Sequence, residues 1–246
     1  MRFLIKFSYD GTNYSGFQTQ KNKNTIQENI EHALRVVNND KETSLVATGR
    51  TDKGVHALCQ YAHADLEINI TEAKLKRALN SNLPNDIHVI ETKIVDSNFH
   101  ARYNVEKKEY QYFINTGEYN PIQRNYVFQY NYKLDVDKMK KAIEYFLGEH
   151  DFRAFVTDNK EKENCIRKIT KASIKDDHGK IIITFTGNGF LRYQVRNMVG
   201  ILIKVGEGKL NPSEIKRIIE SKDRTKSGKT APAEGLYLVE VRYKTV

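Results

Sequence analysis

The order of hydrophobic patterns in the first hundred residues constrains the fold of this chain more than any other feature. Apolar residues alternate with polar ones from Phe3 to Tyr9, which predicts a half-buried strand. The later segments are a helix capped by Thr25, strands over 43–48 and 56–68, a helix from Thr71 that stops before Pro84, and a strand over 86–95. The resulting order of strand, helix, strand, strand, helix, strand is typical of a ferredoxin-like unit.

A second mixed pattern follows a connector over residues 98–104. Its expected elements are a strand around Tyr110, a helix capped by Asp135, a hairpin over 165–187, helices over 190–205 and from Pro212, and a strand over 236–243. We therefore predict an α+β fold with two ferredoxin-like subdomains, residues 1–104 and 105–246. We expect them to share a mostly antiparallel central sheet, with an active-site cleft between them.

The charge of the chain is unevenly distributed. The formal net charge is +9, and residues 105–246 carry 27 basic and 19 acidic residues, against 13 and 12 in residues 1–104. A basic excess favours phosphate-rich partners, so the second subdomain is expected to bind RNA; a generally solvated basic surface is the alternative. The composition, with 39% hydrophobic residues, excludes global disorder.

Other features of the sequence point to a cytoplasmic protein. No apolar run reaches membrane-spanning length, and the N-terminus lacks a signal-peptide cleavage region. Cys59 and Cys165 are too few for a disulfide framework or a zinc cluster, so both are expected to be reduced and buried.

The segment Gly49–Ala57 (GRTDKGVHA) is the strongest candidate for a chemical site. It places Asp52 between two glycines and beside Arg50 and Lys53. Neighbouring positive charge favours the ionised carboxylate, which suits a nucleophile acting on an anionic substrate. The alternative is a surface turn, since Asp and Gly are common turn formers. His56 is interpreted as a hydrogen-bond partner of the loop rather than as a catalyst.

Arg196 is the second candidate. It shares one helix face with Val199, Gly200 and Ile203, which aligns a guanidinium with an apolar stripe. Burial of an unpaired charge is costly, so a carboxylate partner is expected, with Asp52 as one candidate. Alternatively, Arg196 extends to solvent from the edge of the stripe.

Tyr110 and Tyr112 lie on one face of their expected strand, where they either stack on a base or pack in the core. The chain contains no HExxH motif, Walker A pattern, dinucleotide-binding glycine fingerprint or GxSxG elbow. The sequence therefore disfavours chemistry that needs a metal or a nucleotide cofactor.

Six motifs in register resemble the bacterial tRNA pseudouridine synthase A family. They are YDGTNYSGFQ (9–18), GRTDKGVHA (49–57), NFHAR (98–102), EYQY (109–112), VRNMVG (195–200) and APAEGLYL (231–238). The resemblance implies conversion of uridine to pseudouridine at positions 38, 39 and 40 of the tRNA anticodon stem-loop, without a cofactor or metal. It also implies a homodimer that binds tRNA and no membrane.

The same resemblance implies roles for individual residues. Asp52 matches the catalytic aspartate, Arg196 its basic partner, and Tyr110 the tyrosine that packs on the target base and is a candidate for proton transfer. Arg50 matches an arginine that helps the base leave the stack, and Arg102 is an expected substrate contact. Lys53 is expected to contact the substrate through a phosphate, with a solvent-facing side chain as the alternative. The sequence departs from the family where Lys53 replaces a common alanine and where Glu109 directly precedes Tyr110.

Two other functions compete with this interpretation. A non-catalytic RNA-binding protein would explain the charge and the aromatic residues, but not a carboxylate within a basic loop. A nucleotide glycosidase would release free base and usually needs a second catalytic carboxylate.

Overall fold

The computed structural model describes residues 1–156 and 164–244. The chain divides into two compact units. Unit 1 comprises Met1–Glu106 together with the C-terminal stretch from Leu238, and unit 2 comprises Lys107–Tyr237. The division at 104/105 predicted from the sequence differs from this one mainly in the last strand. That strand passes from unit 2 into unit 1, because its later residues pack on unit 1.

Unit 1 has the predicted ferredoxin-like order. Its elements are β1 (Arg2–Tyr9), α1 (Ile26–Val37), β2 (Val46–Ala47), β3 (His56–Asp65), α2 (Glu72–Asn82) and β4 (Ile87–Val95), followed by the later part of β10 (Leu236–Tyr243). The strands are ordered β4-β1-β3-β10, and β2 also pairs with β3. The β1–β3, β1–β4 and β2–β3 ladders are antiparallel. The predicted strand over 43–48 is reduced to Val46–Ala47.

Unit 2 also has a mixed architecture. Its elements are β5 (Val105–Asn115), β6 (Phe128–Gln129), α3 (Val136–Ile143), β7 (Gly148–Asp151), β8 (Ile166–Asp177), β9 (Lys180–Gly187), α4 (Gln194–Gly206) and α5 (Glu214–Ser221). Short 3-10 helices are η1 (Pro121–Gln123), η2 (Glu144–Phe146), η3 (Phe152–Phe155) and η5 (Arg224–Ser227). The strands are ordered β5-β9-β8-β7 in antiparallel pairs, and β6 adds a short parallel pair with β5.

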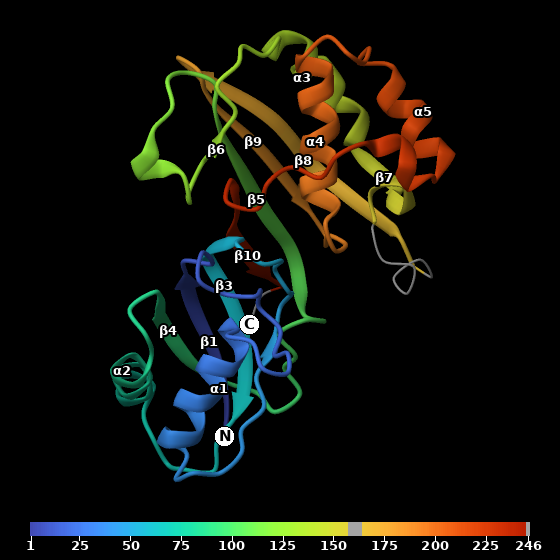
Figure 1. Ribbon diagram of the computed structural model, residues 1–246. Helices are drawn as coiled ribbons and strands as arrows, with labels where there is room; N and C mark the ends of the chain where they lie inside the picture. Colours follow the sequence, from blue (N-terminus) through green and yellow to red (C-terminus); the bar gives the residue numbers. More distant parts are fainter. Residues whose placement is uncertain (157–163, 245–246) are drawn as a thin grey trace. The chain divides into compact units, whose positions relative to one another are not determined.

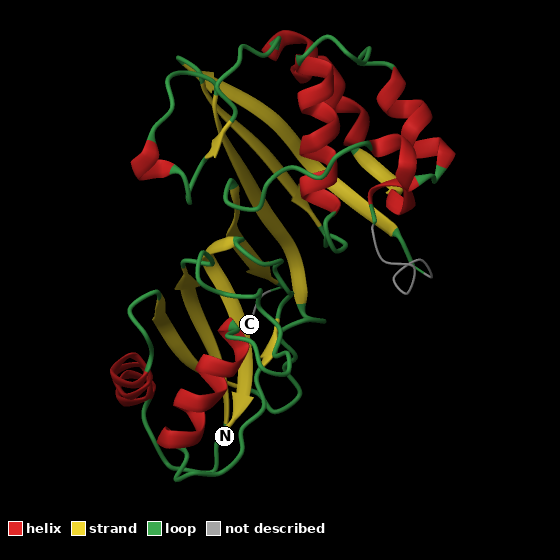
Figure 2. Cartoon of the chain, viewed as in Figure 1, coloured by secondary structure: helices red, strands yellow, loops and turns green. Residues whose placement is uncertain are grey.

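The helices of each unit cover its sheet. In unit 2, α3, α4 and α5 lie over one face of β8 and β9 (Figure 1), and α4 buries ten of its thirteen residues. In unit 1, α1 and α2 lie beside the sheet, as Figure 2 shows in red, and α1 buries Ile26, Ile30 and Leu34. The predicted α+β class is confirmed. No helix among the described residues is both long and apolar enough to cross a bilayer.

Candidate active site

The loop that carries Asp52 connects β2 to β3 in unit 1. The Val55 N–H donates to the Asp52 carbonyl over 3.2 Å, and Gly54 adopts a φ of +78°, which favours glycine. The Asp52 side chain is half-buried, whereas Arg50 and Lys53 are exposed. The segment is therefore a tight turn, as the alternative interpretation proposed. A turn of this kind also suits a catalytic carboxylate, because it holds the group on a short, fixed piece of backbone.

The N-terminal motif YDGTNYSGFQ packs directly against this loop. The Phe17 N–H donates to the Thr51 carbonyl over 3.1 Å, and the Tyr9 hydroxyl shares a 2.8 Å hydrogen bond with Thr51 Oγ1. A β-carbon on Gly11 would lie only 2.1 Å from the carbonyl oxygen of Val55. Gly11 thus allows two backbone segments to approach more closely than any other residue type would. The two motifs form one structural feature, although about forty residues separate them in the sequence.

Two buried side chains of β3, His56 and Gln60, contact the N-terminal motif and the start of the Asp52 loop, respectively. The Gly11 N–H donates to Nδ1 of the buried His56 over 3.1 Å, and Gln60 Nε2 donates to the Gly49 carbonyl over 3.0 Å. Nδ1 of His56 also lies 3.1 Å from a carboxylate oxygen of Asp10. A ring nitrogen that accepts the Gly11 proton carries no proton of its own, so we assign the contact with Gly11 as the hydrogen bond. His56 therefore acts as a hydrogen-bond partner of Gly11, in the N-terminal motif that packs against the loop.

Arg196 lies in the first turn of α4, in unit 2. Its Nε donates to the Ala231 carbonyl over 2.8 Å, and its guanidinium lies 5.3 Å from the centre of the Tyr193 ring. The Ala231 N–H donates back to the Arg196 carbonyl over 3.1 Å. A β-carbon on Gly200 would meet the Lys229 carbonyl oxygen at 2.0 Å, so the 229–231 segment packs tightly along α4. These contacts fix the orientation of the half-buried guanidinium.

Tyr110 lies on β5 opposite Phe185 of β9. It is only 8% exposed, and the ring of Phe190 meets it edge to face at 5.2 Å. Tyr112 is fully buried on the same face, where its hydroxyl donates to the Pro232 carbonyl over 2.8 Å. Burial raises the pKa of Tyr112 well above its usual value, and Glu234 adds to that rise. Core packing thus accounts for Tyr112, while the stacking role of Tyr110 on a base stays a prediction.

The six predicted site residues are divided between the units. Arg50, Asp52, Lys53 and Arg102 belong to unit 1, and Tyr110 and Arg196 belong to unit 2. The structure brings the first three together on one loop and places Arg102 on the connector before β5. The pairing of Asp52 with Arg196 stays a prediction, as do the substrate contacts assigned to Arg50, Lys53 and Arg102.

Sequence reasoning missed a polar network centred on Arg224. Its guanidinium donates to the side chains of Ser227 and Asn197 over 2.9 Å, to the Thr230 hydroxyl over 3.0 Å and to the Gly228 carbonyl over 2.8 Å. Burial lowers the pKa of Arg224. The network attaches the segment before APAEGLYL to α4. One partner, Asn197, lies within VRNMVG, but nothing in the sequence pairs that residue with Arg224.

The described residues contain no cluster of three or more His, Cys, Asp or Glu side chains arranged to hold a metal ion. The six predicted site residues supply one carboxylate, three guanidinium groups, one ammonium group and one tyrosine ring. Such a set suits reactions on an anionic polymer that proceed through a carboxylate nucleophile or base.

Comparison with known proteins defines the class to which this site belongs. A family model described as tRNA pseudouridine synthase matches residues 5–104 and 142–244, and both Asp52 and Arg196 lie within the matched ranges. The chain therefore belongs to the tRNA pseudouridine synthase family.

Individual relatives carry a more specific name. Proteins named tRNA pseudouridine synthase A are similar over nearly their whole length. That of Limosilactobacillus reuteri is 41% identical over 99% of this chain and 97% of its own. That of Pseudothermotoga lettingae is 44% identical over 98% and 99%, and that of Streptococcus mutans is 44% identical over 99% of both chains.

Proposed function

We propose that this protein isomerises uridine to pseudouridine in the anticodon stem-loop of tRNA, at positions 38, 39 and 40. The observation that carries the proposal is the half-buried Asp52 on a braced turn between exposed Arg50 and Lys53, in a chain of this family. The proposal includes a cytoplasmic location and a homodimeric state, and sedimentation of the purified protein would test the second of these.

The chemistry begins with the target uridine leaving the RNA stack. Extrusion of a base costs a few kcal/mol, which protein contacts must replace. Arg50 is exposed and lies two residues before Asp52 on the same loop, so it is suited to fill the vacated space or to contact a phosphate. Tyr110 would offer one aromatic face to the extruded base, and stacking of this kind contributes about 1–3 kcal/mol.

Asp52 then acts as the nucleophile or as the base that starts the reaction. The glycosidic bond from N1 of uracil to C1′ of the ribose breaks, and a bond from C5 of uracil to the same C1′ forms. The proton on C5 is lost and N1 gains one, so no other reactant is consumed. Attack at C1′, attack on the uracil ring and proton abstraction from the ribose all require an ionised Asp52. A bidentate ion pair with Arg196 would keep the Asp52 carboxylate ionised.

The test combines turnover with binding. Asp52→Asn is expected to abolish tritium release from C5-labelled uridine in tRNA while tRNA affinity stays within about tenfold, because binding rests mainly on phosphate contacts. Asp40→Asn is the matched control, since Asp40 is an exposed acid of the same unit and its φ of +60° is one that Asn adopts readily. Near wild-type release by Asp52→Asn would exclude the assigned role.

The competing functions give different products. A non-catalytic RNA-binding protein would bind tRNA without tritium release, and a glycosidase would liberate free uracil, which chromatography detects. Arg196→Lys tests whether Asp52 needs a bidentate partner or only a nearby positive charge, because an ammonium group does not reproduce the planar bidentate contact of a guanidinium group. A severe loss of turnover supports the pairing, and wild-type turnover would contradict it.

A further inference from the structure

Tyr103 stands out among the aromatic residues of unit 1 because it is 78% exposed. Its ring stacks on that of His100, with centroids 4.2 Å apart and an angle of 30° between the planes. One face of the tyrosine ring is therefore covered, and the exposure of the residue leaves the other face open to solvent. We call this pair the His100–Tyr103 stack.

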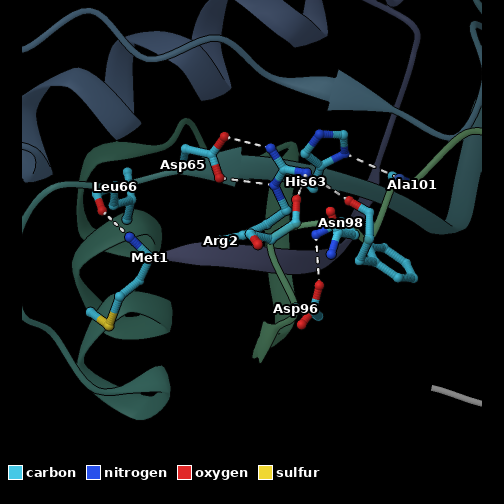
Figure 3. Close-up of polar contacts among 10 residues, drawn as sticks. Met1, Arg2, His63, Asp65, Leu66, Asp96, Asn98 and Ala101 are labelled. Carbon is cyan, nitrogen blue, oxygen red and sulfur yellow. Dashed lines mark hydrogen bonds and ion pairs between the residues drawn. The ribbon is translucent and has the colours of Figure 1, made fainter.

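The backbone beneath the stack is firmly attached to unit 1. Arg2 donates to the carbonyls of Ser97 and Phe99, and the Ala101 N–H donates to Nδ1 of His63 over 3.1 Å. The Tyr243 hydroxyl donates to the Ala101 carbonyl over 3.1 Å. Figure 3 shows the guanidinium of Arg2 held by the carboxylate of Asp65, on the strand that also carries His63. Side chains from β1, β3 and β10 thus anchor the connector.

The connector also folds back on itself around the stack. The His100 carbonyl accepts from the N–H groups of Tyr103 and Asn104 over 3.1 and 3.0 Å, and the His100 N–H donates to Asn104 Oδ1 over 2.7 Å. The Arg102 N–H donates to Nδ1 of His100 over 3.1 Å. Each bond restricts either the backbone or the imidazole ring on which Tyr103 lies. A ligand that stacks on Tyr103 would therefore lose little conformational entropy from the protein.

Apolar packing adds to these hydrogen bonds. Phe99 and Ala101 of the connector form a small core with Leu4 and Val95, and Tyr243 packs against it. This core is separate from the helix-covered side of the sheet, because Leu4 and the buried Phe3 point to opposite faces of β1. The connector is thus a fixed part of unit 1, yet it carries an outward-facing aromatic ring that contributes nothing to that core.

The charge beside the stack indicates the kind of ligand. Arg102 is adjacent to Tyr103 and exposed, and the Lys244 backbone N–H donates to the Asn104 carbonyl over 3.4 Å, which brings a second basic residue to the connector. An open aromatic face beside basic side chains is the combination that binds a nucleobase together with its phosphate.

From this arrangement we propose that the His100–Tyr103 stack is a second RNA-contacting site, on which an unpaired base of tRNA other than the reacting uridine stacks while Arg102 contacts a neighbouring phosphate. The proposal rests on the proposed function, since it assumes tRNA as the substrate. It assigns to the connector a role in holding the RNA, distinct from the chemistry assigned to Asp52.

The experiment measures tRNA affinity, turnover and thermal stability on the full chain. Tyr103→Ala is expected to raise the Kd for an unmodified tRNA transcript roughly tenfold. Turnover at saturating tRNA and Tm should stay at wild-type values, since the ring supports no buried contact. Tyr103→Phe should bind like the wild type, because stacking needs the ring and not the hydroxyl.

The matched control is Tyr132→Ala. Tyr132 is 73% exposed and also contacts another aromatic ring, that of Tyr130, but edge to face at 5.7 Å. Its removal should leave the Kd unchanged. Arg102→Gln should reduce the slope of log Kd against log salt by about one, and Tyr103→Ala should leave that slope unaltered.

The outcomes separate this proposal from the proposed function. A wild-type protein that releases no tritium would overturn the proposed function and, with it, the basis of the stack proposal. An active wild type with a Tyr103→Ala variant that binds tRNA normally would overturn the stack proposal alone. Weakened self-association of Tyr103→Ala in sedimentation, with tRNA affinity unchanged, would assign the surface to a protein contact and would also overturn it.

Discussion

Gly11→Ala tests whether the N-terminal motif positions the loop that carries Asp52. A β-carbon on Gly11 would lie 2.1 Å from the Val55 carbonyl oxygen, whereas real β-carbons essentially never approach within 3.0 Å. The two backbone segments must therefore separate by about 0.9 Å. No rotamer change can relieve this overlap, because the atom that is met belongs to the backbone.

The cost of this separation has two components. Overpacking of this kind costs about 1–3 kcal/mol, and for a protein of this size each kcal/mol lowers Tm by roughly 2–4 °C. The expected fall in Tm is therefore roughly 2–12 °C. Displacement of a catalytic group by about 1 Å costs about a hundredfold in rate. Turnover measured well below Tm should therefore fall far more than the loss of folded protein explains.

The assay pairs tritium release at saturating tRNA with thermal unfolding. Gly117→Ala is the matched control, because the nearest atom to its β-carbon would be Asn115 Oδ1 at an ordinary 3.4 Å. We expect wild-type behaviour from that variant. If Gly11→Ala also kept wild-type turnover, the loop would tolerate the displacement, and the positioning role of the motif would be refuted.

Two further predictions concern stability. Burial, followed by the Arg2 charge, lowers the pKa of His63 from 6.5 to about 4. The unfolded chain therefore binds a proton at His63 more readily than the folded chain does, and the stabilisation present above about pH 6.5 is lost as the pH falls towards 4. His63→Asn, whose amide oxygen can still accept from the Ala101 N–H, should flatten the dependence of Tm on pH in that window. An unchanged slope would contradict the assignment. Arg224→Lys should lower the free energy of unfolding by about 1–3 kcal/mol in a thermal or urea titration, because buried acceptors lose their donors. Arg217 is exposed, so Arg217→Lys should change the free energy of unfolding by less than about 0.5 kcal/mol. Equal effects of the two substitutions would argue against the network.

Local features of the fold were predictable because they depend on residues a few positions apart. Thr25 caps α1 by accepting from the Glu28 N–H, and Asp135 caps α3 by accepting from the Lys138 N–H. The hairpin between β8 and β9 turns where Gly179 has a φ of +86°. In each case the side chain or backbone freedom of one residue acts on its near neighbours.

Features that depend on distant residues were predicted less well. α4 begins at Gln194 rather than near 190, because Tyr193 adopts a left-handed φ of +62° before it. The strand β7 was missed, since its four residues become a strand only by pairing with β8. Propensity over so short a segment carries little information about a partner formed elsewhere in the chain.

The same distinction applies to the candidate site. Residue types and motif spacing gave a set of candidate side chains whose chemical roles stay predictions, and Asp52 lies on a turn as a local pattern predicts. The close approach of Gly11 to Val55 and the Arg224 network were beyond sequence reasoning, because each joins segments that only the fold brings together. The pairing of Asp52 with Arg196 depends on long-range geometry in the same way and stays a prediction.

The path of β10 has a consequence for how the protein is made. Tyr243 fills a gap among Tyr61, Phe99 and Thr48, all of which are synthesised far earlier. A nascent chain that has already exposed β1 to β4 outside the ribosome would still lack this strand. The sheet of unit 1 therefore keeps an open edge at β3 until translation has passed Tyr243, and the N-terminal unit can be completed only after unit 2 has been synthesised.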